Sequence, residues 1–61
     1  MTLDKKLARL RKREGLSQAE VSEALDVSRQ AVTKWETGTS RPSIENLQSL
    51  SRLYNLSLIH I

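Results

Sequence analysis

The sequence predicts an all-α protein, a compact bundle of four or five short helices that forms one domain over residues 1–61. Three observations lead to this prediction. Apolar residues recur at helical spacing, as at Leu7 and Leu10; Gly15 and Gly38 follow such stretches directly; and small polar residues stand where helices would begin. A chain of 61 residues buries only about 60% of its unfolded surface. We therefore expect packed helices and no deep substrate cavity.

The first helix is expected over about residues 3 to 14, because Leu3, Leu7 and Leu10 recur at helical spacing and Gly15 follows. This segment is strongly basic, and positive charge returns later in the chain. The residues concerned are Lys5, Lys6, Arg9, Arg11, Lys12 and Arg13, then Arg29, Lys34 and Arg41. Such a pattern fits a basic face that meets a polyanion, or equally a solvated helix that keeps the protein in solution.

The second helix is expected to begin at Gln18. Ser17 stands three residues before Glu20, the spacing of a capping box in which each side chain bonds the other's free backbone amide. Asp26 is the expected corner after this helix, because the short Asp side chain tolerates the left-handed conformation. The apolar residues expected to pack inward from the helix and its corner are Val21, Leu25 and Val27.

A third helix is expected to start at Arg29, capped by Ser28, and to end at Gly38. Val32 and Trp35 lie on one side of it. The opposite side carries polar residues at spacings of three and four, namely Gln30, Thr33, Lys34 and Thr37. If the apolar side packs on the first two helices, the polar side must face outward. Trp35 is accordingly interpreted as core, because single-strand binders use several exposed aromatic residues.

A fourth helix is expected to open at Ser43, after a short polar loop over residues 39–42. Its inner face is predicted from apolar spacing, and the residues on it are Ile44, Leu47, Leu50 and Tyr54. This helix would close the core over Trp35. The following segment, LSLIHI, is apolar and nearly without pattern, so no helix is predicted there.

These residues carry a family resemblance. They are Ser17, Gln18, Leu25, Val27, Ser28, Val32, Trp35, Glu36 and Gly38, followed by Arg41 and Pro42. In this order and spacing they resemble the lambda-repressor-like helix-turn-helix family, whose members include the Cro-type and xenobiotic-response-element regulators. The resemblance covers about residues 3–58, with the motif at about 17–37. It implies a sequence-specific regulator of transcription, in particular a repressor, whose third helix lies in the major groove of double-stranded DNA.

Four residues are expected to contact bases. Arg29 suits a bidentate contact to guanine, and a cation beside the positive end of a helix dipole is otherwise poorly placed. Gln30 suits the donor and acceptor edge of adenine, Thr33 a thymine methyl group, and Lys34 a guanine or a phosphate. The alternatives are an ordinary solvated arginine at Arg29, a plain helix former at Gln30, and no contact from Thr33 or Lys34.

Five residues are expected to contact phosphates, and two others to hold the scaffold. The phosphate set is Ser17, Gln18, Ser28, Thr37 and Arg41, although Ser17 could serve only as a cap and Arg41 could be solvated. Arg11 and Glu36 are each expected at the inner border of a helix, where a lone charge would be costly. The family resemblance also points to an ion pair between them. Two departures from the family pattern are Ser22, where alanine is usual, and Asp26, where glycine is usual.

Composition argues against other classes of protein. The chain has no cysteine and one histidine, His60, which has no neighbouring ligand at a metal-binding spacing. Acidic residues do not converge on a pocket and neither glycine belongs to a phosphate loop, so neither an enzyme nor a cofactor is predicted. No small-molecule effector is evident. Without a membrane-spanning run or a signal peptide, we expect a cytoplasmic protein.

A monomer contacts too few base pairs for genomic specificity, so we expect a homodimer on a two-fold related operator. Exposed apolar residues near the end are the candidate interface, namely Leu53, Leu58, Ile59 and Ile61. The alternative is that this tail folds onto its own core. The competing function is a protein-interaction module, an adaptor or antitoxin-like domain that uses the same fold on a protein partner.

Overall fold

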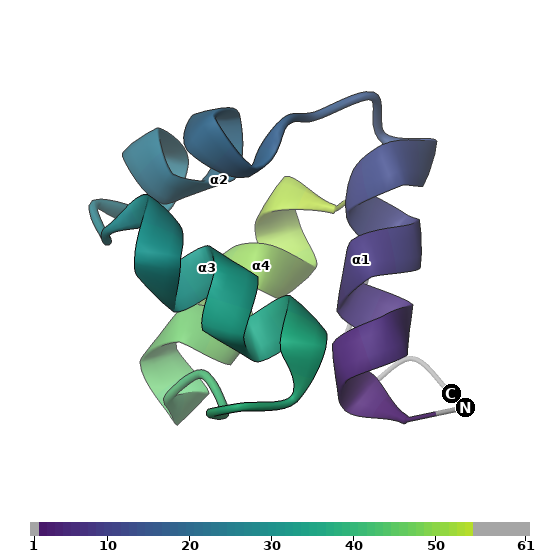
Figure 1. Ribbon diagram of the computed structural model, residues 1–61. Helices are drawn as coiled ribbons and strands as arrows, with labels where there is room; N and C mark the ends of the chain where they lie inside the picture. The colour runs from purple at the N-terminus through teal and green to yellow at the C-terminus, as the bar shows by residue number, and fades with distance from the viewer. Residues whose placement is uncertain (1, 55–61) are drawn as a thin grey trace.

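The computed structural model describes residues 2–54, which form four α-helices and no strand (Figure 1). These are α1 (Leu3–Arg13), α2 (Gln18–Leu25), α3 (Arg29–Thr37) and α4 (Ile44–Leu53). Helix α3 packs against both α1 and α2, and α2 packs in addition against α4. The predicted all-α class is confirmed. None of the helices in residues 2–54 has the length and the apolar composition that spanning a bilayer requires.

Local signals determine where the helices begin and end. The Ser17 hydroxyl accepts from the Glu20 amide at 3.0 Å, and the Glu20 carboxylate accepts from the Ser17 amide at 2.8 Å, which completes the predicted capping box. Asp26 adopts the left-handed conformation, with φ 57°. Gly38, with φ 80°, ends α3 in the same conformation. Helix α1 ends one residue earlier than predicted, because Glu14 is its cap.

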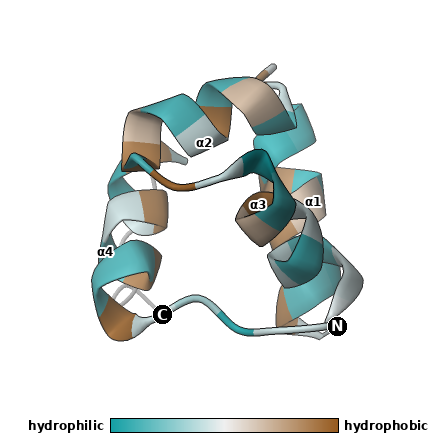
Figure 2. Cartoon of the chain, turned by 60° about the vertical axis from the view of Figure 1, so that its left-hand side comes forward, coloured by the Kyte–Doolittle hydropathy of each residue, from teal (hydrophilic) through white to brown (hydrophobic). Residues whose placement is uncertain are grey.

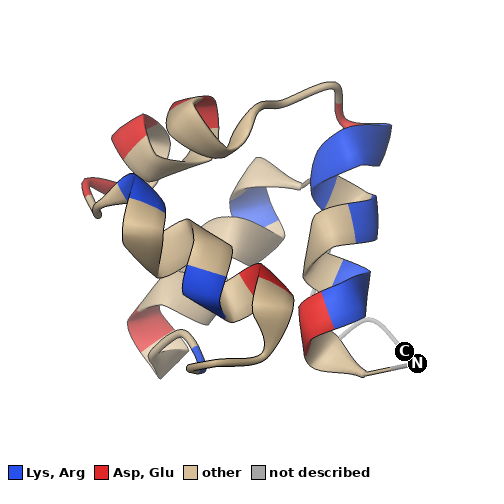
Figure 3. Ribbon diagram, viewed as in Figure 1, with Lys and Arg blue, Asp and Glu red and all other residues tan. Residues whose placement is uncertain are grey.

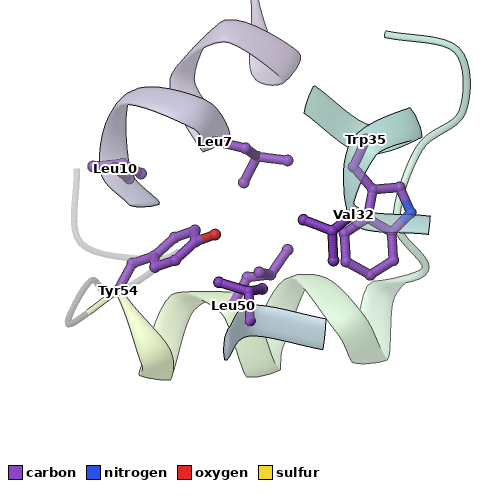
Figure 4. Packing of buried hydrophobic residues seen from close by; sticks show 7 residues of the cluster. Leu7, Leu10, Val32, Trp35, Leu50 and Tyr54 are labelled. Atoms are coloured by element: carbon purple, nitrogen blue, oxygen red, sulfur yellow. The ribbon is translucent and has the colours of Figure 1, made fainter. Parts of the chain in front are cut away.

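The core lies where the helices meet. Its buried apolar side chains are Leu7, Leu10, Val21, Val32, Trp35, Leu50 and Tyr54. Figure 4 shows the labelled ones among these side chains converging from α1, α3 and the end of α4, and Figure 2 shows hydrophobic residues recurring in bands along each helix. Trp35 is only 6% exposed, so its interpretation as core is confirmed. Burying each side chain of this size contributes roughly 1.5–3 kcal/mol, which is how these short helices are held together.

Two expectations about α4 are wrong. Ile44 was assigned to the inner face but is 74% exposed, because it is the first residue of the helix and lies a turn before the half-buried Leu47. Leu53 was expected to be exposed but is half-buried and packs against the core. Leu53 therefore has a partner within its own chain. The other proposed interface residues, Leu58, Ile59 and Ile61, lie outside the described residues.

Two polar contacts stabilise the frame further. The Ser22 hydroxyl donates to the Ala19 carbonyl at 2.7 Å, so this buried departure from the family pattern keeps its hydrogen bond. The Arg13 guanidinium donates to the Tyr54 carbonyl at 3.1 Å. That contact ties α1 to the end of α4, where a cation is favoured by the helix dipole.

Candidate nucleic-acid interface

The outward side of α3 is a polar stripe made of Gln30, Thr33, Lys34 and Thr37, all of them exposed. It faces outward because Val32 and Trp35, on the opposite side of the helix, are 1% and 6% exposed and belong to the core. Arg29, also exposed, stands at the start of the same helix. The structure thus brings together on one helix the four residues expected to contact bases.

Charge is distributed unevenly around this stripe. Figure 3 shows basic residues on α3 and along α1, whereas α2 carries acidic residues and no basic ones. Within residues 2–54, the side chains of Arg29, Gln30, Lys34 and Arg41 make no hydrogen bond or ion pair. Arg29 in particular has no acidic residue in its own helical turn, although the helix dipole disfavours a cation there. These side chains are available to an external acceptor.

Hydroxyl groups at the helix starts keep a free proton. Ser17 accepts from the Glu20 amide and Ser28 accepts from the Ala31 amide at 3.1 Å. A hydroxyl that accepts through its oxygen can still donate its own proton, so both can bind a phosphate oxygen while capping their helices. Thr37 differs, because its hydroxyl donates to the Thr33 carbonyl at 3.0 Å. A phosphate contact from Thr37 would require that bond to break.

Gln18 is bonded to α3 through both ends of its amide. Its Nε2 donates to Glu36 Oε1 at 3.1 Å, and its Oε1 accepts from the Thr33 hydroxyl at 3.0 Å. The sequence prediction gave Gln18 only a phosphate contact. These two bonds cross the corner between helices and are separated by 18 and 15 positions in the chain. Contacts between residues so far apart in the chain cannot be predicted from a local sequence pattern.

The structure contains the ion pair expected between Arg11 and Glu36. The guanidinium donates twice, from Nε to Oε2 at 2.7 Å and from Nη2 to Oε1 at 3.0 Å, the bidentate geometry that Arg favours. The two side chains are 13% and 6% exposed. Arg11 also donates to the Leu16 carbonyl at 2.9 Å, and its hydrogen bonds to Glu36 raise the pKa of Arg11. The pair fixes α1 against α3.

Arg41 lies in the loop after α3, exposed, beside a small hollow that is also lined by Trp35, Gly38 and Asp4. The Asp4 carboxylate packs on Gly38, and a hydrogen bond from the Thr2 side chain lowers the pKa of Asp4. The charge around Arg41 is therefore mixed. No cluster of acidic or histidine residues able to hold a metal occurs in the described part of the chain.

Comparisons with known proteins agree with this geometry. A relative from Enterococcus faecalis, the HTH-type transcriptional activator BcrR, is 36% identical over 58 residues, which cover 95% of this chain and 28% of that protein. The P22 c2 repressor, solved with a synthetic operator, has a TM-score of 0.87 and 28% identity, with 93% of this chain and 86% of the other covered.

The biofilm regulator SinR, solved with DNA, has a TM-score of 0.83 and 24% identity, with 92% of this chain and 90% of the other covered. The likeness to SinR is a likeness of fold. The chain spans about 28% of the length of the curated relative that it matches. The model of the helix-turn-helix family matches residues 7–61, and the chain belongs to that family.

Proposed function

We propose that this chain is a sequence-specific regulator of transcription, acting as a repressor, that places α3 in the major groove of double-stranded DNA. The observation that carries the proposal is the outward polar stripe of α3, with Arg29, Gln30 and Lys34 unpartnered within residues 2–54. The B-DNA major groove admits one helix and presents a distinct donor and acceptor pattern for each base pair. The proposed activity is binding without a chemical step, in the cytoplasm where the operator would be.

Base selection is assigned to the exposed residues of α3. Arg29 pairs with the O6 and N7 atoms of a guanine, Gln30 with the N6 and N7 edge of an adenine, and Lys34 with a guanine or a neighbouring phosphate. Thr33 contacts a thymine. Each good bidentate pair discriminates against the wrong base by about 1–3 kcal/mol, so Arg29 and Gln30 contribute most of the preference.

Phosphate contacts set the register of the protein on the duplex. Ser17 and Ser28 donate their free hydroxyl protons. The backbone N–H of Gln18, the first residue of α2, adds a donor at the positive end of that helix. Arg41 contacts the backbone next to the α3–α4 loop. Thr37 joins this set only if it gives up its bond to the Thr33 carbonyl.

Two copies are needed for a specific operator, and we propose a homodimer with half-sites about one helical turn apart. Repression is the simpler mode, because a bound domain blocks a promoter without any further surface. The solved c2 protein is named a repressor. The relative named an activator matches this chain over only 28% of its own length, so its activating function cannot be transferred from this match.

The test is selection of duplexes from a random library at stated salt, followed by binding of variants to the enriched operator. Arg29→Ala should cost about 1–3 kcal/mol and relax the preference at one base pair. Lys12→Ala is the matched control, since Lys12 is an exposed cation on α1. This variant should at most weaken all duplexes alike and reduce the salt slope by about 1. An adaptor or antitoxin-like domain would enrich no motif, and that result would refute the proposal.

A further inference from the structure

We propose that Gln18 is a positioning residue that holds Thr33 so that Thr33 offers DNA its methyl group and no hydroxyl proton. The inference rests on the proposed function, because it concerns what the polar stripe of α3 can recognise. It begins at Glu36, inside the scaffold, and proceeds outward through two hydrogen bonds to the stripe.

The orientation of the Gln18 amide is dictated by the ion pair. Glu36 is the carboxylate of an ion pair in which Arg11 donates to it twice, and a carboxylate only accepts hydrogen bonds. The amide atom 3.1 Å from Glu36 Oε1 must therefore be the NH₂ group of Gln18. The opposite orientation would bring two oxygens together. Gln18 consequently presents its carbonyl oxygen to Thr33.

The Thr33 hydroxyl then has two hydrogen-bond partners among residues 2–54, and both are acceptors. Gln18 Oε1 lies 3.0 Å away and the Arg29 carbonyl 3.2 Å away. Because both neighbours only accept, the hydroxyl proton points inward whether it bonds Gln18 Oε1 or the Arg29 carbonyl. Thr33 is exposed, but it cannot donate to guanine O6 or N7 or to thymine O4 without breaking one of these bonds. Its methyl group remains for an apolar contact with the C5 methyl of thymine.

The Gln18 bond is what distinguishes Thr33 from its neighbour on the stripe. Thr37 lies near two carbonyls of its own helix, those of Thr33 at 3.0 Å and Lys34 at 3.4 Å, and its remaining partner is the Thr39 hydroxyl, which can donate or accept. Thr33 receives its second acceptor from another helix, and that acceptor is itself fixed by Glu36. The direction of the hydrogen bonds therefore runs one way, from Thr33 through Gln18 to the buried carboxylate.

The test uses the enriched operator with each thymine of a half-site replaced in turn by deoxyuridine, which lacks the C5 methyl group. For the parent, replacement of one thymine should weaken binding about fourfold, the effect of losing one buried methyl group. Thr33→Val keeps the methyl group and should keep this sensitivity. Thr33→Ser keeps the hydroxyl but lacks the methyl group, so its binding should no longer depend on the C5 methyl group of that thymine.

In Gln18→Met, the methionine side chain has a similar length but makes no hydrogen bonds. Replacing the thymine contacted by Thr33 with deoxyuridine should therefore weaken binding of this variant less than it weakens binding of the parent, while the guanine preference assigned to Arg29 persists. Thermal melts of every variant verify that each is folded at the assay temperature. A purely structural role for Gln18 would change affinity for all duplexes equally and would leave the position-specific methyl effect intact.

Three results would overturn the inference. Thr33→Val could lose the base preference as fully as Thr33→Ala, which would mean that the hydroxyl reads the base. Gln18→Met could retain the full methyl effect. In the free protein, NMR could show the Thr33 hydroxyl proton exchanging equally fast in the parent and in Gln18→Met, where only the Arg29 carbonyl remains as acceptor, which would exclude the Gln18 link without reference to DNA. Failure to enrich any motif would instead refute the proposed function, while the NMR result would still decide the link.

Discussion

Replacing Glu36 with alanine tests whether the ion pair holds the scaffold. Glu36 accepts three hydrogen bonds, two from Arg11 at 2.7 and 3.0 Å and one from Gln18 at 3.1 Å. Removing one partner of a fully buried pair costs about 3–5 kcal/mol, because the other charge is left without compensation. Arg11 keeps its bond to the Leu16 carbonyl and is 13% exposed. We therefore expect a loss of about 2–4 kcal/mol.

That loss is large for so small a domain. At about 0.05–0.15 kcal/mol per residue, a chain of 61 residues has a free energy of unfolding of roughly 3–9 kcal/mol. Glu36→Ala would remove much of it, so the variant should be compared with the parent by urea denaturation in the cold, with the m-value measured for both. A lower midpoint with an unchanged m-value reports stability alone.

The matched control is Glu14→Ala. Glu14 pairs with Arg13 at 3.3 Å, but the two side chains are 30% and 51% exposed, and a surface pair contributes only about 0–1 kcal/mol. The double variant Arg11→Met, Glu36→Leu should be more stable than Glu36→Ala, because no unpaired charge is left inside. A Glu36→Ala urea transition that coincides with that of the parent would refute this account of the pair.

Three further predictions concern single positions. Gly15→Ala and Gly38→Ala should each cost about 1 kcal/mol, because both glycines have a positive φ. Gly38→Ala should destabilise more, since a Cβ there would lie 3.1 Å from Asp4 Oδ2, whereas a Cβ at Gly15 meets nothing within 4 Å. Equal melting temperatures for the two variants would contradict the added contact at Gly38. Asp26→Gly should be neutral or stabilise by up to about 1 kcal/mol, since Asp26 is a non-glycine residue at φ 57°, and a lower melting temperature would show that the Asp side chain contributes more than its backbone costs. Burial raises the pKa of Tyr54 to about 12 from its usual value of 10.0. The contribution of this shift to the free energy of unfolding is therefore constant below pH 10 and is lost between pH 10 and about 12, because the unfolded chain releases the proton first. The difference between the parent and Tyr54→Phe in alkaline denaturation should show this loss, and a tyrosinate absorbance that titrates at pH 10 in the folded protein would contradict it.

Much of the fold was predictable because its signals are local. A capping box needs only Ser17 and Glu20 at the right spacing, and the left-handed corner at Asp26 needs only a short polar side chain. The errors at Ile44 and Leu53 have a different origin. Spacing along α4 put Ile44 on the inner face and left Leu53 off it. Which turn of a helix is covered, however, depends on where neighbouring helices end, and that is a property of the packing.

The candidate site shows the same division. The outward face of α3 followed from Val32 and Trp35, because an amphipathic helix has only one side to bury. The hydrogen bonds of the stripe did not follow, since Gln18 meets Glu36 and Thr33 only when the corner between α2 and α3 has its actual angle. Helical spacing and the family resemblance indicated which side chains are proposed to bind DNA. They did not indicate which of those side chains already use their protons in hydrogen bonds within the protein.

On the proposed mechanism, stability and specificity share one group in this domain, the Glu36 carboxylate. Glu36 accepts from Arg11, which fixes α1 against α3, and from Gln18, which in turn accepts from Thr33. Because a carboxylate cannot donate, its charge sets the direction of every bond in this chain of contacts. A neutral residue at this position would leave the Gln18 amide free to turn, and the Arg29 carbonyl would then be the one acceptor of these two that still holds the Thr33 proton inward. On the proposed mechanism, what α3 offers to a base depends on a charge buried beneath it as much as on the exposed residues themselves.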